Sequence, residues 1–136
     1  MHIVTGHQFW SPNKMKTPLE IRNAKNSDIK DIVALSYKAY PKMGGYKADT
    51  VRGQINNFRE GCFVILKDDV IVAYSASLII EEKKALSQHN WKEITANGFG
   101  STHNPDGDYL YGYETCVDPE VRGQRLGQRI YNARKR

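Results

Sequence analysis

Residues 115–127 carry the sequence TCVDPEVRGQRLG, and this stretch decides how the rest of the chain is interpreted. It continues a β-forming run, contains Gly123, and leads into a segment with Leu126, Ile130 and Ala133 at helical spacing. The pattern therefore predicts a strand, a glycine-containing loop and a helix. A helix N-terminus presents unpaired N–H groups and partial positive charge, and glycine lets a ligand approach the backbone closely. This order of elements is typical of an anion site, especially for phosphate.

The positive charge of the chain is concentrated at its end. The 136 residues include 20 Lys and Arg and 15 Asp and Glu, a net charge of +5. Residues 121–136 hold six of the basic side chains and no acidic one, so residues 1–120 have a net charge of −1. On a regular helix, four arginines fall on one side, next to the apolar stripe: Arg122, Arg125, Arg129 and Arg136. They form either a solvated helix face or contacts to the phosphates of a ligand.

Composition excludes several classes of protein. No apolar run approaches the ~20 residues of a membrane span, and the N-terminal residues lack the pattern of a secretory signal. Cys62 and Cys116 lie far apart, and neither has a CxxC partner. The sequence therefore predicts no disulfide scaffold, no metal site, no membrane partner and a reducing, cytoplasmic setting.

The remaining pattern predicts an α+β domain with the order β-α-α-β-β-β-α, preceded by an extension over residues 1–18. The expected strands are residues 19–22, 62–67, 70–80 and 109–117. The middle two form a hairpin around a turn at Asp68-Asp69.

Helical patterns follow the first and the last of these strands. The first helix has Ser27 as N-cap and ends at Pro41, with Ile29, Ile32, Val33, Tyr37 and Tyr40 at helical spacing. The second includes Val51, Ile55 and Phe58, with Gly61 at its C-terminal cap, and the last begins near Gly123. Residues 81–97 are expected to form a loop with one short helix.

Residues 122–127 resemble motif A of the GNAT superfamily, the Gcn5-related N-acetyltransferases. The pattern of that family is Arg or Gln, two residues, Gly, one residue, then Gly or Ala. Arg122 takes the first position and Gly127 the last, while Arg125 stands where the family has its middle glycine. The order of elements over residues 19–136 also resembles the first part of the GNAT fold, a mixed β-sheet flanked by helices.

A closer resemblance involves two segments. Residues 122–134 and 98–108 are similar to the GNAT domains found N-terminal to carbon–nitrogen hydrolase (nitrilase-like) domains, in which Arg at the middle motif position is tolerated. This similarity implies a C-terminal nitrilase-like domain as a partner in the full protein. A GNAT domain also continues after its motif A helix with further strands, and that half often supplies a Tyr as general acid. We therefore expect residues 19–136 to be a partial GNAT domain.

The resemblance implies that the chain binds acetyl-CoA as acyl donor and transfers the acetyl group to a primary amine, without a metal. It implies that the main chain of Cys116 and Val117 pairs with the pantetheine arm. It further implies that main-chain N–H groups hold the pyrophosphate over Arg122, Gly123, Gln124, Arg125, Leu126 and Gly127.

Glu114 is the acidic side chain best placed on the strand 109–117 to act as general base. Its other interpretation is a strand carboxylate paired with a cation. Strand alternation predicts that Tyr111 and Tyr113 face away from Glu114 and that Cys116 lies on its side. His103 lies in a turn-rich loop and has either a catalytic or substrate-binding role or a structural role in that turn.

Three functions are compatible with these residues. The first is an acyl-CoA-dependent N-acetyltransferase. The second is a non-catalytic acyl-CoA-binding or regulatory module of a carbon–nitrogen hydrolase fusion protein. The third is a nucleic-acid-binding domain that uses the basic helix. It is disfavoured because residues 1–120 are net acidic and no nucleic-acid-binding motif is present.

Overall fold

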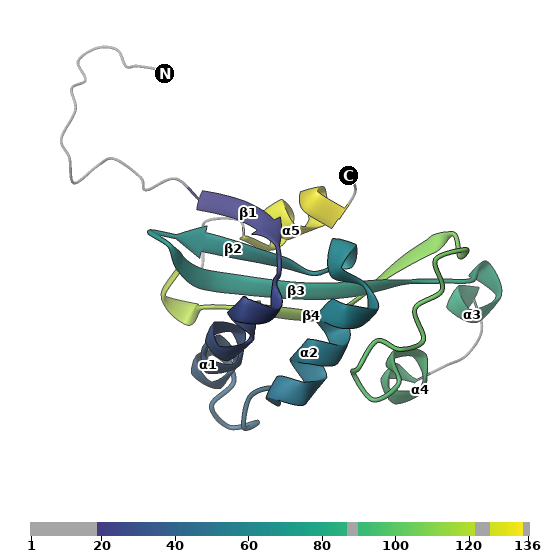
Figure 1. The fold of residues 1–136 in the computed structure, drawn as a ribbon, viewed down its shortest axis with the longest axis horizontal. Coiled ribbons are helices and arrows are strands. Elements are labelled where there is room, and N and C mark those ends of the chain that lie inside the picture. The colour runs from purple at the N-terminus through teal and green to yellow at the C-terminus, as the bar shows by residue number, and fades with distance from the viewer. Residues whose placement is uncertain (1–18, 87–89, 122–125, 135–136) are drawn as a thin grey trace, which may run out of the picture.

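The computed structural model describes residues 19–86, 90–121 and 126–134. Four strands form one sheet in the order β1-β2-β3-β4 (Figure 1). They are β1 (Leu19–Asn23), β2 (Phe63–Lys67), β3 (Val70–Ile80) and β4 (Tyr109–Val117). All neighbouring pairs are antiparallel. The α+β class is confirmed, and the described strands form an antiparallel sheet rather than the expected mixed one.

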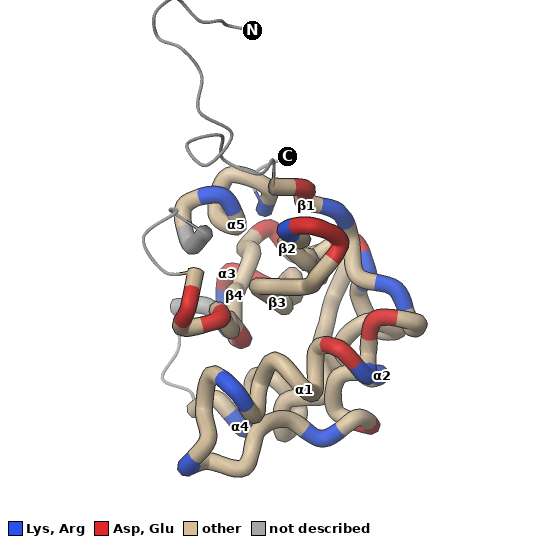
Figure 2. Tube along the Cα trace, turned by 90° about the vertical axis from the view of Figure 1, so that its left-hand side faces the viewer, with Lys and Arg blue, Asp and Glu red and all other residues tan. Residues whose placement is uncertain are grey.

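Helices cover both faces of the sheet. One face packs against α1 (Ile29–Ala39) and α2 (Ala48–Asn57), and the other packs against α5 (Leu126–Arg134) (Figures 1 and 2). The connection from β3 to β4 contains α3 (Glu82–Leu86) and α4 (Trp91–Thr95), two short helices where we expected one. Among the described helices, none has the length and apolar character needed to cross a membrane.

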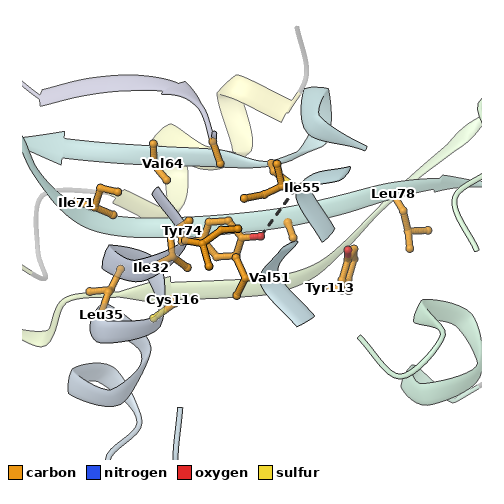
Figure 3. Close-up of a cluster of buried hydrophobic side chains, with 14 of the residues drawn as sticks. Ile32, Leu35, Val51, Ile55, Val64, Ile71, Tyr74, Leu78, Tyr113 and Cys116 are labelled. Carbon is orange, nitrogen blue, oxygen red and sulfur yellow. Dashed lines mark hydrogen bonds between the residues drawn. The ribbon is translucent and has the colours of Figure 1, made fainter. Parts of the chain in front are cut away.

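The larger core lies between the sheet and the helices α1 and α2 (Figure 3). Tyr74 of β3 is fully buried in it, and its hydroxyl donates to Oε1 of Gln54 at 2.6 Å. The amide nitrogen of Gln54 donates in turn to the carbonyl oxygen of Gly98 at 2.8 Å. This chain of hydrogen bonds satisfies the buried polar groups and attaches the β3–β4 connection to α2.

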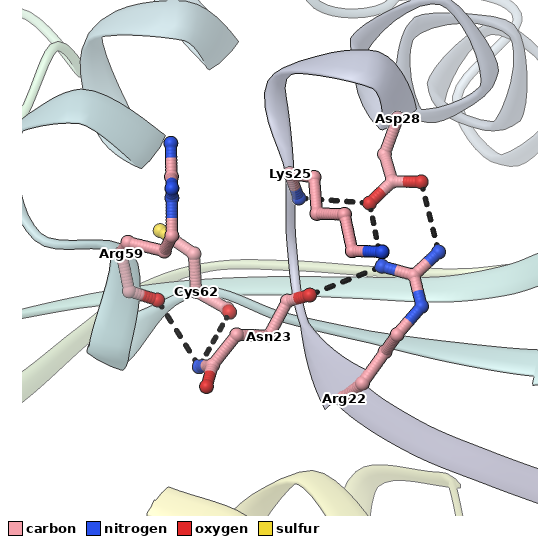
Figure 4. A network of polar contacts seen from close by, with 6 residues as sticks. All are labelled: Arg22, Asn23, Lys25, Asp28, Arg59 and Cys62. Atoms are coloured by element: carbon pink, nitrogen blue, oxygen red, sulfur yellow. Dashed lines mark hydrogen bonds and ion pairs between the residues drawn. The ribbon is translucent and has the colours of Figure 1, made fainter.

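The start of α1 differs from our expectation. A 3₁₀ turn over Asn26–Asp28 precedes the helix, and Ser27 makes no capping hydrogen bond. Asp28 makes no side-chain hydrogen bond to the first turn of α1 either; its carboxylate accepts from the Lys25 N–H and forms an ion pair with Arg22 of β1, both at 2.8 Å (Figure 4). The strand and the helix are joined through this carboxylate.

Two further details of the helices were predicted wrongly. Tyr37 is exposed, and Leu35 occupies the buried face of α1 instead. Gly61 does not cap α2, which ends before Phe58; it lies in a separate 3₁₀ turn over Arg59–Gly61. A Cβ on Gly61 would lie 2.5 Å from the Phe58 ring, so close packing is what this glycine allows.

The hairpin turn is confirmed at Asp68-Asp69. Both residues have positive φ angles, 53° and 63°, which is the geometry of a type I′ turn, where glycine is strongly favoured at the second position.

We expect Asp69→Gly to raise the free energy of unfolding by about 0.5 kcal/mol, measured by urea denaturation. Asp69→Ala should lower it, and a loss of stability in the glycine variant would contradict this account of the turn.

Candidate functional site

A β-bulge interrupts β4 beside the candidate base. Ala76 of β3 pairs with Glu114 and Ser77 pairs with Gly112, so Tyr113 has no partner on β3. A bulge sets two residues against one and disturbs the alternation of side chains. Tyr113 is accordingly buried in the core cluster of α1 and α2 (Figure 3), on the side where Glu114 meets Tyr46.

The expected orientation of the two tyrosines is therefore wrong. Tyr111 and Tyr113 both pack against the core on the α1 and α2 side, together with Cys116. The alternation rule assumes a regular strand, and the extra residue in the bulge shifts its parity. As a result, Glu114 and Tyr113, which alternation places on opposite faces, line the same hollow.

A hollow of about 560 Å³ opens beside the bulge. It lies where the α1–α2 connection, α4 and β4 meet. Its lining includes four aromatic side chains and one carboxylate: Tyr40, Tyr46, Trp91, Tyr113 and Glu114.

Hydrogen bonds to the β4 backbone fix two of these aromatic walls. The Tyr40 hydroxyl donates to the Thr115 carbonyl oxygen at 2.8 Å, and Trp91 Nε1 donates to the Tyr113 carbonyl oxygen at 3.1 Å. The shape of the hollow is thus tied to the strand that carries Glu114.

The environment of Glu114 suits a proton acceptor. Burial raises the pKa of the Glu114 carboxyl group above its ordinary value, and a hydrogen bond with Tyr46 lowers it by less. Burial and the neighbouring Glu114 charge both raise the pKa of Tyr46, so this hydroxyl stays protonated and can donate. Glu114 forms none of the ion pairs found in the described part of the chain. The interpretation of Glu114 as a strand carboxylate paired with a cation therefore finds no support among the described residues.

The two residues expected to pair with the pantetheine arm lie at the end of β4. Cys116 pairs with Tyr74 of β3, and Val117 pairs with Ala73. The Cys116 side chain is fully buried, and burial raises the pKa of its thiol to about 11, so it is not a nucleophile at neutral pH. The opposite edge of β4 has no neighbouring strand among the described residues.

Most of the predicted phosphate loop lies outside the described residues. These are Arg122, Gly123, Gln124 and Arg125. The last two positions of the motif, Leu126 and Gly127, are the first residues of α5. On the other side of the loop, Asp118 is buried after β4 and forms an ion pair with Lys38 of α1 at 2.9 Å. The chain therefore leaves β4 from an anchored point and resumes at a helix N-terminus.

His103 has a structural role. Its Nδ1 accepts from the Ile79 N–H at 3.0 Å, and its ring stacks on Phe58 at 4.0 Å. Burial lowers the pKa of its imidazole, which agrees with a neutral ring that accepts from the backbone. It does not line the hollow that contains Glu114. No group of three or more His, Cys, Asp or Glu side chains with metal-binding geometry occurs in the described ranges.

Sequence reasoning missed Tyr46 and Trp91. Tyr46 lies in the connection between α1 and α2, and Trp91 is the first residue of the short helix α4. Neither belongs to a periodic pattern or motif. The clue available was indirect, namely aromatic residues in segments that are otherwise polar and glycine-containing.

Glu114 makes stability depend on pH in a defined direction. The pKa of Glu114 is raised in the folded state, so the unfolded state loses this proton first as the pH rises. The raised pKa therefore lowers the free energy of unfolding at pH values above the ordinary pKa of 4.5. We expect Glu114→Gln to increase the free energy of unfolding at pH 7, and the gain to disappear as the pH falls below 4.5. Urea denaturation at several pH values measures this difference in the free energy of unfolding between the variant and the natural protein. A gain that is smaller at pH 7 than at pH 4 would refute the prediction.

Comparison with known proteins gives curated relatives, whereas no family model matches the chain. The probable hydrolase YhcX of Bacillus subtilis strain 168 is 33% identical over 122 residues, which cover 90% of this chain and 24% of that protein. The uncharacterized N-acetyltransferase YkwB of the same strain is 27% identical over 118 residues, covering 84% of this chain and 52% of that protein. The chain thus spans only part of the length of each relative.

Solved structures share the fold. The GphF GNAT-like decarboxylase in complex with isobutyryl-CoA has a TM-score of 0.71 and 25% identity, over 83% of this chain and 55% of that one. The loading GNATL domain of CurA from Lyngbya majuscula has a TM-score of 0.70 and 20% identity, over 85% of this chain and 55% of that one. The chain therefore has a GNAT-like fold, which confirms the fold expected for residues 19–136.

Proposed function

We propose that this chain is the acyl-CoA-binding part of an N-acyltransferase, which moves an acetyl group from acetyl-CoA to a primary amine. The observation that carries the proposal is the half-buried Glu114 side chain, which lies at a bulge of β4 and lines an aromatic hollow. The name of the relative YkwB, an N-acetyltransferase, supports the same reaction class.

Acetyl-CoA would be held by the residues identified at the end of β4 and the start of α5. The fit rests on two observations: β4 has an edge without a neighbour in the described sheet, and α5 begins within the motif, at Leu126 and Gly127. Strand main-chain groups at Cys116 and Val117 suit the amide groups of pantetheine. The main chain of residues 122–127 at a helix N-terminus suits the pyrophosphate. Bound there, acetyl-CoA supplies the thioester carbonyl that the amine attacks.

The amine would enter through the hollow beside the bulge. Aromatic rings such as those of Tyr40 and Trp91 attract an ammonium group, and so does the Glu114 carboxylate. Glu114 then accepts the proton that the amine must lose before its nitrogen can attack the carbonyl carbon. The raised pKa brings this base closer to neutral pH, and Tyr46 orients it through the hydrogen bond between them.

A second candidate is a non-catalytic acyl-CoA-binding or regulatory module of a carbon–nitrogen hydrolase fusion protein. The relative YhcX favours this candidate, because it is named a probable hydrolase and the segment that matches this chain covers only 24% of its length. In that case acetyl-CoA would bind, and no amine would be acylated. The two candidates differ in amine-dependent release of CoA.

The proposed phosphate loop predicts a loss of cofactor affinity on substitution. We expect Arg122→Ala and Arg125→Ala each to raise the Kd for acetyl-CoA about tenfold, because each removes a charge-assisted contact to phosphate. Isothermal titration calorimetry measures this on the purified chain. Glu114→Gln is the control and should keep the Kd of the natural protein. Unchanged affinity in both arginine variants would place the phosphates elsewhere.

The proposed base predicts a loss of turnover without a loss of binding. We expect Glu114→Gln to reduce amine-dependent release of CoA by ~10²–10⁴-fold at pH 7, which is the usual contribution of a general base. Release of the thiol can be followed with a chromogenic disulfide, using short alkylamines as acceptors. If the natural protein binds acetyl-CoA but acylates none of them, the module interpretation is favoured. If the variant is as active as the natural protein, Glu114 is not the base.

A further inference from the structure

Arg134, in the last turn of α5, reaches across the sheet to the back of the β4 bulge. Its Nη2 donates to the carbonyl oxygen of Ala76 at 3.2 Å and to that of Glu114 at 3.4 Å. It also donates to the hydroxyl of Ser75, which is fully buried. Ala76 and Glu114 are paired at the step where the register between β3 and β4 shifts. One nitrogen atom therefore bonds to both strands at the bulge.

The neighbouring strand position leaves room for this guanidinium. A Cβ on Gly112 would lie 2.2 Å from Nη1 of Arg134, so any larger residue would displace the arginine. Gly112 pairs with Ser77 on the other side of the bulge. The bulge is thus bordered by a glycine that lets the Arg134 guanidinium approach the strand backbone closely.

The guanidinium group of Arg134 is incompletely hydrogen-bonded in this position. Its Nε is buried without a hydrogen-bond partner in the described part of the chain, and no carboxylate there forms an ion pair with it. Burial of a cation without a counter-ion is unfavourable. The hydrogen bonds that Arg134 makes in the described part of the chain go to Ser75, Ala76 and Glu114, so its side chain bridges the two strands at the bulge.

Holding this backbone also directs the Glu114 side chain. The Glu114 carbonyl oxygen bonds to Arg134 on the α5 side of the sheet, whereas the carboxyl group faces Tyr46 and the hollow on the other side. The same helix begins at Leu126 and Gly127, the end of the proposed phosphate loop. Helix α5 therefore contains both the end of that loop and the side chain that bonds to the backbone of the proposed base.

We propose that Arg134 is a positioning residue that holds the β4 bulge from behind, so that Glu114 points into the hollow and is fixed relative to α5. This inference rests on the proposed function for its catalytic consequence. Its structural part, the orientation and burial of Glu114, stands without that function.

The proposal is tested by substituting Arg134 and measuring the pKa of the Glu114 carboxyl group. Arg134→Met keeps an apolar stem and removes the guanidinium, and Arg134→Lys keeps a donor that can restore one contact. Lys30→Met, an exposed position on α1, is the matched control. The groups facing Glu114 are Tyr46, Tyr113, Cys116 and Tyr74, with Lys47 on the wall of the hollow, and none of them is changed.

We expect Arg134→Met to lower kcat for the amine by ~10²-fold, a loss typical of a displaced catalytic group, while KM for acetyl-CoA changes less than about threefold. The pKa of the Glu114 carboxyl group, followed by carbon-detected NMR, should fall toward its ordinary value as the side chain becomes solvated. The acidic limb of the pH–kcat/KM profile should shift in the same direction. Arg134→Lys should recover part of both effects, and Lys30→Met should show neither.

Gly112→Ala provides an independent variant, because the added Cβ would displace the Arg134 guanidinium from the bulge. The arginine itself, and so its positive charge, is retained in this variant. It should reproduce the effects of Arg134→Met, and the double variant should be no worse than either. If Arg134→Met does not fold, Gly112→Ala and Arg134→Lys carry the same test. An unchanged Glu114 pKa and kcat in these variants would overturn the proposal, and so would a loss of thermal stability alone. If the natural protein acylates no amine, the proposed function fails, whereas the NMR measurement still decides whether Arg134 positions Glu114.

Discussion

The register shift between β3 and β4 is the constraint on which the candidate site depends. With Ala76 opposite Glu114 and Ser77 opposite Gly112, Tyr113 is an extra residue. It turns two consecutive side chains toward the face of α1 and α2. Without the bulge, Tyr113 and Glu114 would lie on opposite faces, and the hollow would lose either an aromatic wall or its carboxylate.

Contacts from both layers of helices converge on this stretch of β4. From the α1 and α2 side, Tyr40 and Trp91 donate to carbonyl oxygens of the strand. From the α5 side, Arg134 does the same. Because each bond reaches main-chain atoms, it holds the backbone of the strand directly, which is the preorganisation that a general base and a bound thioester require.

The sequence was sufficient for the regular parts of the fold. The run Tyr109–Val117 and the hairpin around Asp68-Asp69 were predicted from β-forming residues and turn chemistry, and the structure confirms both. Glu114 was found as the candidate base because it lies on that strand near the motif. The position of Tyr46 depends on the path of the α1–α2 connection, and the orientation of Tyr113 depends on the bulge. Neither follows from local propensity or periodicity, because both arise from contacts between segments far apart in the chain.

The most direct measurement compares the titration of the Glu114 carboxyl group with the pH dependence of the reaction. Carbon-detected NMR of the natural protein gives the pKa of Glu114, and the acidic limb of kcat/KM for the amine gives the pKa of the essential base in the free enzyme. The account predicts that the two values coincide and lie above the ordinary value of 4.5. A Glu114 pKa at or below 4.5, or a kinetic pKa that does not match it, would contradict the assignment of Glu114 as the base.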